Sequence, residues 1–186
     1  MKVLKIIGLA IISLIALFFI IPLFMETEYK VERSIAINAN QETVHDFMKH
    51  FSNFDRWSPW TELDPKMSTE ISGVDGELGA KYYWKGNSDV GEGLMEITSL
   101  SNDEINIHLK FIEPFAAESP TTYRFSEKDN QTTVTWYMEG EMSYPWNIFG
   151  LFMSMEDEIG NDFEKGLSKL KREIEKLEIE IQSNLR

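Results

Sequence analysis

The feature that most constrains this chain is an uninterrupted apolar run near its start. Residues Ile6–Phe24 read IIGLAIISLIALFFIIPLF, which is 19 residues without a charged side chain. A helix needs about 20 apolar residues to cross the hydrocarbon core of a bilayer, so the run predicts a membrane-spanning helix. A cleavable signal peptide is the alternative, but its apolar region is usually about 7–15 residues long and ends in a small-residue cleavage site. The sequence PLFMETEYK contains no such site, which favours an uncleaved anchor over residues 1–25.

The charges on either side of this run predict its orientation. Lys2 and Lys5 precede it, whereas Glu26 and Glu28 follow it. Because positive charge is retained on the cytoplasmic side, the N-terminus is expected inside and residues 26–186 outside. The sequence therefore predicts a single-pass membrane protein whose C-terminal domain lies outside the cytoplasm.

Composition excludes several classes of function for the remaining chain. The protein has 18 basic and 31 acidic side chains, a net charge of −13. Nucleic-acid binding depends on clustered Lys and Arg that neutralise phosphates, so nucleic acid is not expected as a partner. The absence of cysteine excludes disulfides, thiolate nucleophiles and cysteine-ligated metals. With only three histidines, metal chemistry would have to rest mostly on carboxylates. Neither a metal site nor a cofactor is expected.

Residues 26–186 are dominated by apolar residues that alternate with polar ones. This period of two predicts half-buried strands, and the clearest example is Ile105–Phe111. Turn-forming segments such as Gly86–Asp89 separate the strands, which is typical of antiparallel hairpins. The strands are predicted within residues 29–38, 80–85, 95–98, 105–111, 123–125 and 133–139.

Two helices are predicted beside these strands. Asn40 is a suitable N-cap for a short amphipathic helix, whose apolar positions are Val44, Phe47, Met48 and Phe51. A much longer helix ends the chain, because apolar residues recur there at alternating spacings of four and three. They are Phe163, Leu167, Leu170, Ile174, Leu177 and Ile181. A coiled coil would show the same spacing, but a one-sided sheet needs a covering layer, which favours an α+β fold in which this helix covers the sheet.

Five short segments of the chain resemble a known superfamily. They are VERSI (31–35), NFDRWSPWTELDP (53–65), GEGLMEI (91–97), TVTW (133–136) and GNDFEKGL (160–167). Together they are similar to the helix-grip fold of the START-related SRPBCC superfamily, and most of all to its membrane-anchored members of polyketide cyclase/dehydrase type. Asn40 departs from the proline that is often found in such sequences. The resemblance implies a curved antiparallel sheet wrapped around the C-terminal helix, with a cavity between them that binds a hydrophobic small molecule or lipid.

The candidate ligand-binding residues are large side chains expected between the sheet and this helix. They are Trp57, Trp60, Tyr82, Trp84, Met95, Leu109, Phe111, Tyr123, Trp136, Phe163 and Leu167. Most such rings simply fill a core. Gly160 and Gly166 favour a cavity, because each costs about 1 kcal/mol in a helix relative to Ala and would leave volume beside the sheet. The apolar segment Tyr144–Met155 is too short to span a bilayer and is predicted as a packed turn, a ligand gate or a membrane-dipping element.

No catalytic group can be assigned from the sequence. The carboxylate pairs Glu92/Glu96 and Glu139/Glu141 fall on polar strand faces, and Arg56 is a candidate either for an acidic ligand group or for a structural contact with an aromatic ring. The preferred function is therefore a membrane-anchored, extracytoplasmic binding protein for a hydrophobic small molecule or lipid. The alternatives are a cyclase- or dehydratase-like enzyme acting on such a ligand, and an interaction module whose cavity is filled by its own side chains.

Overall fold

The computed structural model describes residues 2–184, with the side chains at 181, 182 and 184 outside the description. The helices are α1 (Lys2–Ile20), α2 (Gln41–Lys49), α3 (Phe54–Trp57) and α4 (Met155–Asn184). Short 3₁₀ helices are η1 (Ile21–Phe24), η2 (Phe51–Asn53), η3 (Trp60–Glu62) and η4 (Trp146–Leu151). The strands are β1 (Glu28–Ile37), β2 (Ser68–Ser72), β3 (Lys81–Lys85), β4 (Glu92–Leu100), β5 (Glu104–Glu113), β6 (Ala117–Lys128) and β7 (Gln131–Glu141).

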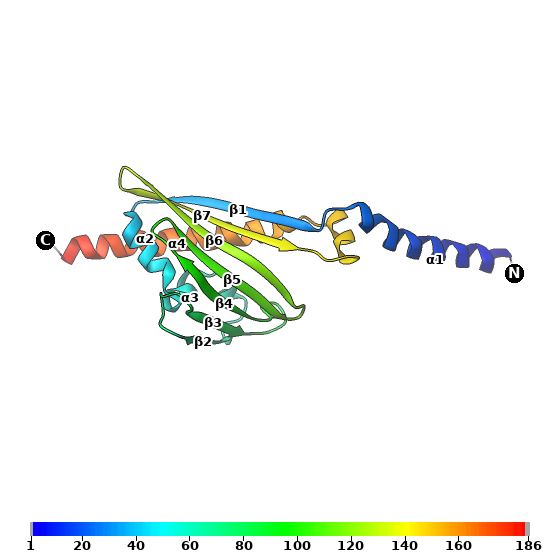
Figure 1. The fold of residues 1–186 in the computed structure, drawn as a ribbon, viewed down its shortest axis with the longest axis horizontal. Coiled ribbons are helices and arrows are strands. Elements are labelled where there is room, and N and C mark those ends of the chain that lie inside the picture. Colours follow the sequence, from blue (N-terminus) through cyan, green and yellow to red (C-terminus); the bar gives the residue numbers. More distant parts are fainter. Residues whose placement is uncertain (1, 185–186) are drawn as a thin grey trace.

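The strands form one seven-stranded sheet in the order β1-β7-β6-β5-β4-β3-β2, and every neighbouring pair is antiparallel. The chain passes from β1 through α2, η2, α3 and η3 to β2 at the opposite edge of the sheet. It then returns strand by strand, so that the last strand, β7, pairs with β1. The sheet is strongly curved, and α4 runs along its concave side (Figure 1). The predicted α+β helix-grip fold is therefore confirmed.

Alternation along the strands produces the predicted apolar face. On β1, Val31 and Ile37 are fully buried, and on β7 the inward residues Val134, Trp136 and Met138 are buried as well. The short helix α2 is capped as expected, because the side chain of Asn40 accepts a hydrogen bond of 2.8 Å from the backbone N–H of Thr43, in agreement with the N-cap preference for Asn.

The stripe on the C-terminal helix faces the sheet. Phe163, Leu167, Leu170 and Ile174 are at most 1% exposed, so α4 is the covering layer rather than one strand of a coiled coil. Ser154 caps the helix, since its Oγ lies 3.2 Å from the backbone N–H of Asp157. The last predicted position of the stripe, Ile181, lies outside the described side chains.

The N-terminal helix stands apart from this domain. Residues Lys2–Phe24 form one helical segment with a mean hydropathy of 3.0, and only 6% of its most apolar window is buried. It is long and apolar enough to cross a membrane, and a signal sequence near the N-terminus would meet the same criteria. In Figure 1 it projects from the end of the domain opposite to the C-terminus.

Candidate ligand-binding cavity

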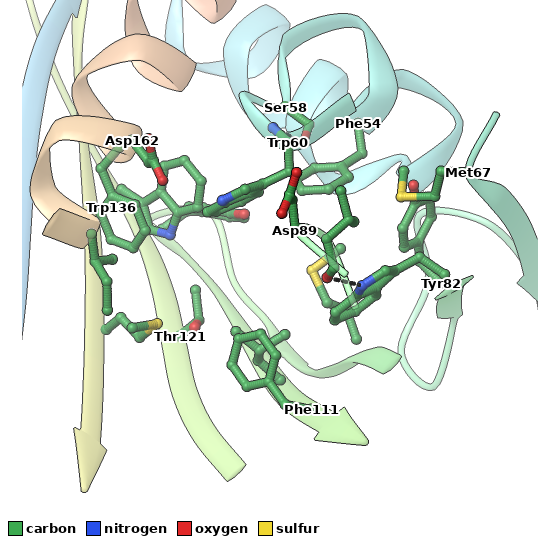
Figure 2. Close-up of a pocket in the computed structure, with 18 residues that line it drawn as sticks. Phe54, Ser58, Trp60, Met67, Tyr82, Asp89, Phe111, Thr121, Trp136 and Asp162 are labelled. Carbon is green, nitrogen blue, oxygen red and sulfur yellow. Dashed lines mark hydrogen bonds between the residues drawn. The ribbon is translucent and has the colours of Figure 1, made fainter. Parts of the chain in front are cut away.

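A cavity of about 220 Å³ lies between the concave face of the sheet, the first turns of α4 and the segment around η3. It is larger than an engineered apolar cavity of about 150 Å³ that binds benzene. Its wall is predominantly aromatic and aliphatic (Figure 2). The lining residues are Phe54, Ser58, Trp60, Met67, Tyr82, Trp84, Asp89, Val90, Met95, Leu109, Phe111, Thr121, Tyr123, Trp136, Met138, Ile159, Asp162 and Phe163.

Nine of the eleven predicted ligand-binding residues lie at this wall. They are Trp60, Tyr82, Trp84, Met95, Leu109, Phe111, Tyr123, Trp136 and Phe163. The other two, Trp57 and Leu167, do not line it and lie inside the packed core. The ring of Trp57 contacts Tyr123 and Trp136 edge-on, with centroids 5.9 and 5.4 Å away, so it supports the wall from behind.

One side of the cavity is held rigid by stacked rings. The indole of Trp136 on β7 lies flat against Phe163 on α4, with centroids 3.8 Å apart and an interplanar angle of 9°. Trp60 meets the same indole edge-on at 5.8 Å. Because the three rings come from the sheet, the covering helix and the intervening segment, this cluster joins all three walls.

A glycine shapes the opposite side. A Cβ atom at Gly93 on β4 would lie 2.3 Å from Cη2 and Cζ2 of Trp84 and 2.6 Å from the carbonyl oxygen of Lys110. The indole of Trp84 therefore lies directly across the strand, where it meets Phe111 edge-on at 6.1 Å. Its Nε1–H donates to the carbonyl of Val90 at 3.3 Å, which holds the ring at the cavity wall.

The helix glycines do not create the cavity, contrary to the expectation from the sequence. A Cβ at Gly160 would lie 2.1 Å from Nη2 of Arg33, and one at Gly166 would lie 3.1 Å from both Pro59 and Trp136. The missing side chains are thus replaced by a guanidinium group and by packed rings. Both glycines permit close packing of α4 against its neighbours, and the ligand volume comes from the curvature of the sheet.

Two tyrosines at the wall retain their protons. The hydroxyl of Tyr82 donates to Oδ1 of Asp55 at 2.5 Å, and burial together with this carboxylate raises the pKa of Tyr82. Burial also raises the pKa of Tyr123. Since a hydroxyl with a raised pKa is a weaker acid at neutral pH, neither tyrosine is tuned for proton transfer in the cavity.

Sequence reasoning missed the polar part of the wall. Ser58, Asp89, Thr121 and Asp162 all line the cavity. Thr121 lies on the inward face of β6, two residues before Tyr123. The alternation along β6 could have revealed Thr121, but this residue directly follows Pro120, and a proline within an alternating run argues against a strand.

The remaining candidates for chemistry lie outside the cavity. Arg56 contacts Oε2 of Glu173 at 2.7 Å and lies 5.0 Å above the ring of Phe47, so its role is structural. On the outer face of the sheet, Glu92 accepts hydrogen bonds from Lys85 and Tyr83 at 2.5 and 2.7 Å. Within residues 2–184, no cluster of three or more His, Asp or Glu side chains is arranged to hold a metal ion.

A family model described as polyketide cyclase/dehydrase and lipid transport matches residues 28–175, which include the whole sheet and most of α4. The chain belongs to this family. The match begins at β1, so it leaves the N-terminal helix outside. No curated protein matches the chain at a significant level of similarity.

Solved structures share this fold at low sequence identity. Protein CV1439 from Chromobacterium violaceum is 12% identical with a TM-score of 0.57, covering 78% of this chain and 96% of that one. The Aha1 dimer from Colwellia psychrerythraea is 16% identical with a TM-score of 0.52, covering 79% and 96%. The di-domain aromatase/cyclase StfQ of the steffimycin biosynthetic pathway is 8% identical with a TM-score of 0.57, covering 78% of this chain and 50% of that one. At these identities the likeness concerns the fold alone.

Proposed function

We propose that this family member is a membrane-anchored binding protein for a hydrophobic small molecule or a single lipid chain. The observation that carries the proposal is the cavity between the sheet and α4, whose wall combines nine large apolar or aromatic side chains predicted from the sequence. Burying a hydrocarbon chain there yields about 0.8 kcal/mol per CH₂ without directed hydrogen bonds. A space of about 220 Å³ also argues against the interaction module, whose own side chains would fill it.

The anchored, extracytoplasmic location is part of the same proposal. The helix over Lys2–Phe24 is exposed along nearly its whole length, as expected for a helix that lipid surrounds. Lys2 and Lys5 precede the apolar run, which favours a cytoplasmic N-terminus. The proposal therefore divides the chain into an anchor at residues 1–25 and a ligand-binding domain at residues 26–186 outside the cytoplasm.

The absence of cysteine permits a direct test of this topology. A single cysteine is introduced by Asp129→Cys in the turn between β6 and β7, and another, in a separate chain, by Val3→Cys, which keeps both lysines. In intact spheroplasts a membrane-impermeant maleimide should label only the first, and the intact mass should retain Met1–Phe24. Labelling of Val3→Cys alone would show the opposite orientation, and a mass lacking the helix would identify it as a cleaved signal peptide.

Ligand binding is tested with the full chain in lipid nanodiscs. Native mass spectrometry should show one additional apolar molecule per chain, absent from empty nanodiscs treated in the same way. Trp136→Ala removes a central ring from the wall and should abolish this mass. A chain that carries no ligand and whose melting temperature does not respond to any apolar compound would contradict the proposal, because a ligand that binds only the folded state must stabilise it.

A cyclase- or dehydratase-like enzyme is the alternative, and the family description names such activities. General acid–base catalysis requires a group that reaches the substrate with a pKa near the working pH. The lining tyrosines Tyr82 and Tyr123 have raised pKa values, and the hydroxyl of Tyr82 is bonded to Asp55. Recovery of the bound molecule in a chemically altered form after incubation with the protein would favour the enzyme over the binding protein.

A further inference from the structure

Two polar atoms in the cavity wall have no hydrogen-bond partner among the described residues. They are Nε1 of Trp136 and Oγ1 of Thr121, in residues that are 3% and 4% exposed. Both residues line the cavity, and Figure 2 shows the indole nitrogen of Trp136 on the edge of the ring nearer Thr121. A buried polar group without a partner destabilises the fold, and such groups are rare in native proteins.

The register of the sheet brings these two residues together. Thr121 on β6 lies opposite Met138 on β7, and Tyr123 lies opposite Trp136. Thr121 and Trp136 are therefore diagonal neighbours on the same face, a relation in which side chains are roughly 7–8 Å apart at their origins. Neither polar atom is accessible to water in this structure, so the binding of one ligand oxygen between them requires a side chain of the wall to move aside.

We propose that Trp136 and Thr121 bind the polar end of the ligand, and that this end is an uncharged hydroxyl or carbonyl oxygen. This inference rests on the proposed binding function and specifies its ligand. An indole N–H can only donate, whereas a threonine hydroxyl both donates and accepts. An oxygen with free lone pairs satisfies both groups at once, and a purely hydrocarbon ligand would leave both unpaired.

The charges and the hydrogen-bonding groups of the cavity wall argue against a charged polar end. Its described wall contains two carboxylates, Asp89 and Asp162, and no Lys, Arg or His. The nearest partner of Asp162 is Lys165, at 2.9 Å, and the side chain of Lys165 is 65% exposed. A fatty-acid carboxylate would thus enter without a cation, which is costly in an apolar site. An ammonium group could pair with Asp89 or Asp162, but it carries no acceptor for the N–H of Trp136 and would leave the indole unpaired.

The test compares three ligands that share the same brominated hydrocarbon chain and differ at its other end. They are 10-bromodecanol, 10-bromodecanoate and 1-bromodecane. Bromine quenches tryptophan on contact, and Trp60, Trp84 and Trp136 all line the cavity. The full chain is used in nanodiscs at pH 7 with Trp146→Phe, because Trp146 does not line the cavity and is 58% exposed. We expect the alcohol to bind at least about fivefold more tightly than either the carboxylate or the bromoalkane.

Thr121→Val provides the decisive variant, because it keeps the shape of the side chain and removes the hydroxyl. It should weaken binding of the alcohol about three- to tenfold, which corresponds to the loss of one ordinary hydrogen bond, and leave the affinity for the bromoalkane unchanged. Thr133→Val is the matched control, since Thr133 is exposed on the opposite face of the neighbouring strand. It should change the binding of none of the three.

Each outcome separates this inference from the function on which it rests. If the carboxylate binds as tightly as the alcohol, or if Thr121→Val leaves alcohol binding unchanged, the assignment of an uncharged polar end is wrong while the apolar binding site stands. If none of the three compounds quenches the chain, including the bromoalkane, the proposed binding function itself is wrong.

A different surface carries a second inference. The connection from β7 to α4, residues 142–154, contains no charged side chain, and none of its residues lines the cavity, which argues against a ligand gate. Six of its large apolar side chains are at least 44% exposed, and Phe152 is 83% exposed, whereas Ile148 is buried. These exposed side chains are Tyr144, Trp146, Phe149, Leu151, Phe152 and Met153, and they are called here the connection patch.

The connection patch lies directly against the end of the N-terminal helix. The hydroxyl of Tyr144 donates to the carbonyl of Phe19 at 3.1 Å. The amide Nδ2 of Asn147, a residue only 2% exposed, donates to the carbonyl of Pro22 at 2.9 Å. Figure 1 shows the same arrangement, with the segment before α4 beside the junction of α1 and β1.

We infer that the connection patch is immersed in the membrane–water interface beside α1. The inference depends on α1 being the proposed anchor, because side chains in contact with Phe19 and Pro22 then lie at the depth where the helix leaves the bilayer. Trp and Tyr are enriched at that depth, and an exposed apolar patch of this kind marks an interaction surface. The bilayer is thus a second contact of the domain, made by residues outside the spanning helix.

Site-specific fluorescence tests this contact in the full chain. Phe152→Cys and Asp129→Cys are labelled separately with the polarity-sensitive dye NBD and reconstituted in phosphatidylcholine vesicles that contain doxyl-labelled lipid. Emission from position 152 should be shifted to shorter wavelength and quenched by the doxyl group, whereas emission from position 129 should be that of a dye in water. Water-like emission at 152 would overturn the inference. A blue shift that doxyl lipid does not quench, and that depends on protein density, would assign the patch to a second copy of the chain instead.

Discussion

The contact between Gly93 and Trp84 gives a sharp test of how the cavity wall is built. Gly93→Ala adds one methyl group to a buried position of β4, where it would meet Cη2 and Cζ2 of Trp84 at 2.3 Å and the carbonyl of Lys110 at 2.6 Å. Neither neighbour can yield freely. The indole is only 8% exposed, and the carbonyl belongs to the paired strand β5.

The expected magnitude follows from two opposing contributions. Overpacking a well-filled site costs about 1–3 kcal/mol. Replacing glycine by alanine also restricts the unfolded chain, which returns about 0.4–1 kcal/mol where the backbone permits it. The net loss of unfolding free energy for Gly93→Ala is therefore about 1–2 kcal/mol, or a decrease in melting temperature of roughly 2–8 °C for a domain of this size.

The displaced indole has only the cavity in front of it, so ligand affinity should fall together with stability. Thermal unfolding and bromodecanol quenching of the same nanodisc samples measure both effects. Gly150→Ala is the matched control, because its Cβ would meet only Cε of Met25 at an ordinary 3.6 Å. The double variant Gly93→Ala/Trp84→Phe should recover part of the stability, since the smaller ring removes the clashing atoms. Unchanged melting and unchanged binding in Gly93→Ala would refute the close packing from which this reasoning starts.

Three further outcomes are expected. A chain that ends before Phe163 should lose its cooperative thermal transition, because the sheet loses its cover. Burial of the ring of His45, which packs 5.1 Å from Phe125, lowers the pKa of this histidine. Because the unfolded state then binds the proton more readily, the neutral buried ring stabilises the fold above the unfolded pKa of about 6.5, and this stabilisation is lost as the pH falls. The melting temperature of the wild type should therefore be more acid-sensitive than that of His45→Gln. Tyr82→Phe removes the hydrogen bond to Asp55 and should cost about 1.5–3 kcal/mol in denaturant titration, while 1-bromodecane binds as before because the cavity keeps its shape.

Much of the fold could be predicted because its elements follow local periodicity. The alternation around Ile105 and the spacing from Phe163 to Ile174 depend only on which face of a strand or helix is buried. The edge strand β2 was harder to predict. β2 runs from Ser68 to Ser72 with every side chain exposed, so no apolar alternation reveals it.

The site was predictable where it consists of large inward rings and unpredictable where contacts are remote in sequence. Trp57 and Trp60 are three residues apart, yet only Trp60 reaches the cavity. Gly160 makes room for Arg33, which approaches from β1 and ion-pairs with Glu156 and Glu164 at 2.6 and 2.8 Å. Such an arrangement depends on tertiary packing between distant segments, and no spacing within the helix encodes it.

The short junction between the N-terminal helix and the sheet has a mechanical consequence. Only residues 25–27 separate η1 from β1, and Asn147 bonds to this junction at the carbonyl of Pro22. A ten-residue strand extends about 33 Å, so a rigid junction turns a helix tilt of about 20°, the average in bilayers, into a displacement of about 11 Å at the far end of β1. Because tilt follows the thickness of the hydrocarbon layer, a spanning α1 would make the direction and extent of the domain's lean over the membrane surface depend on the thickness of the membrane itself.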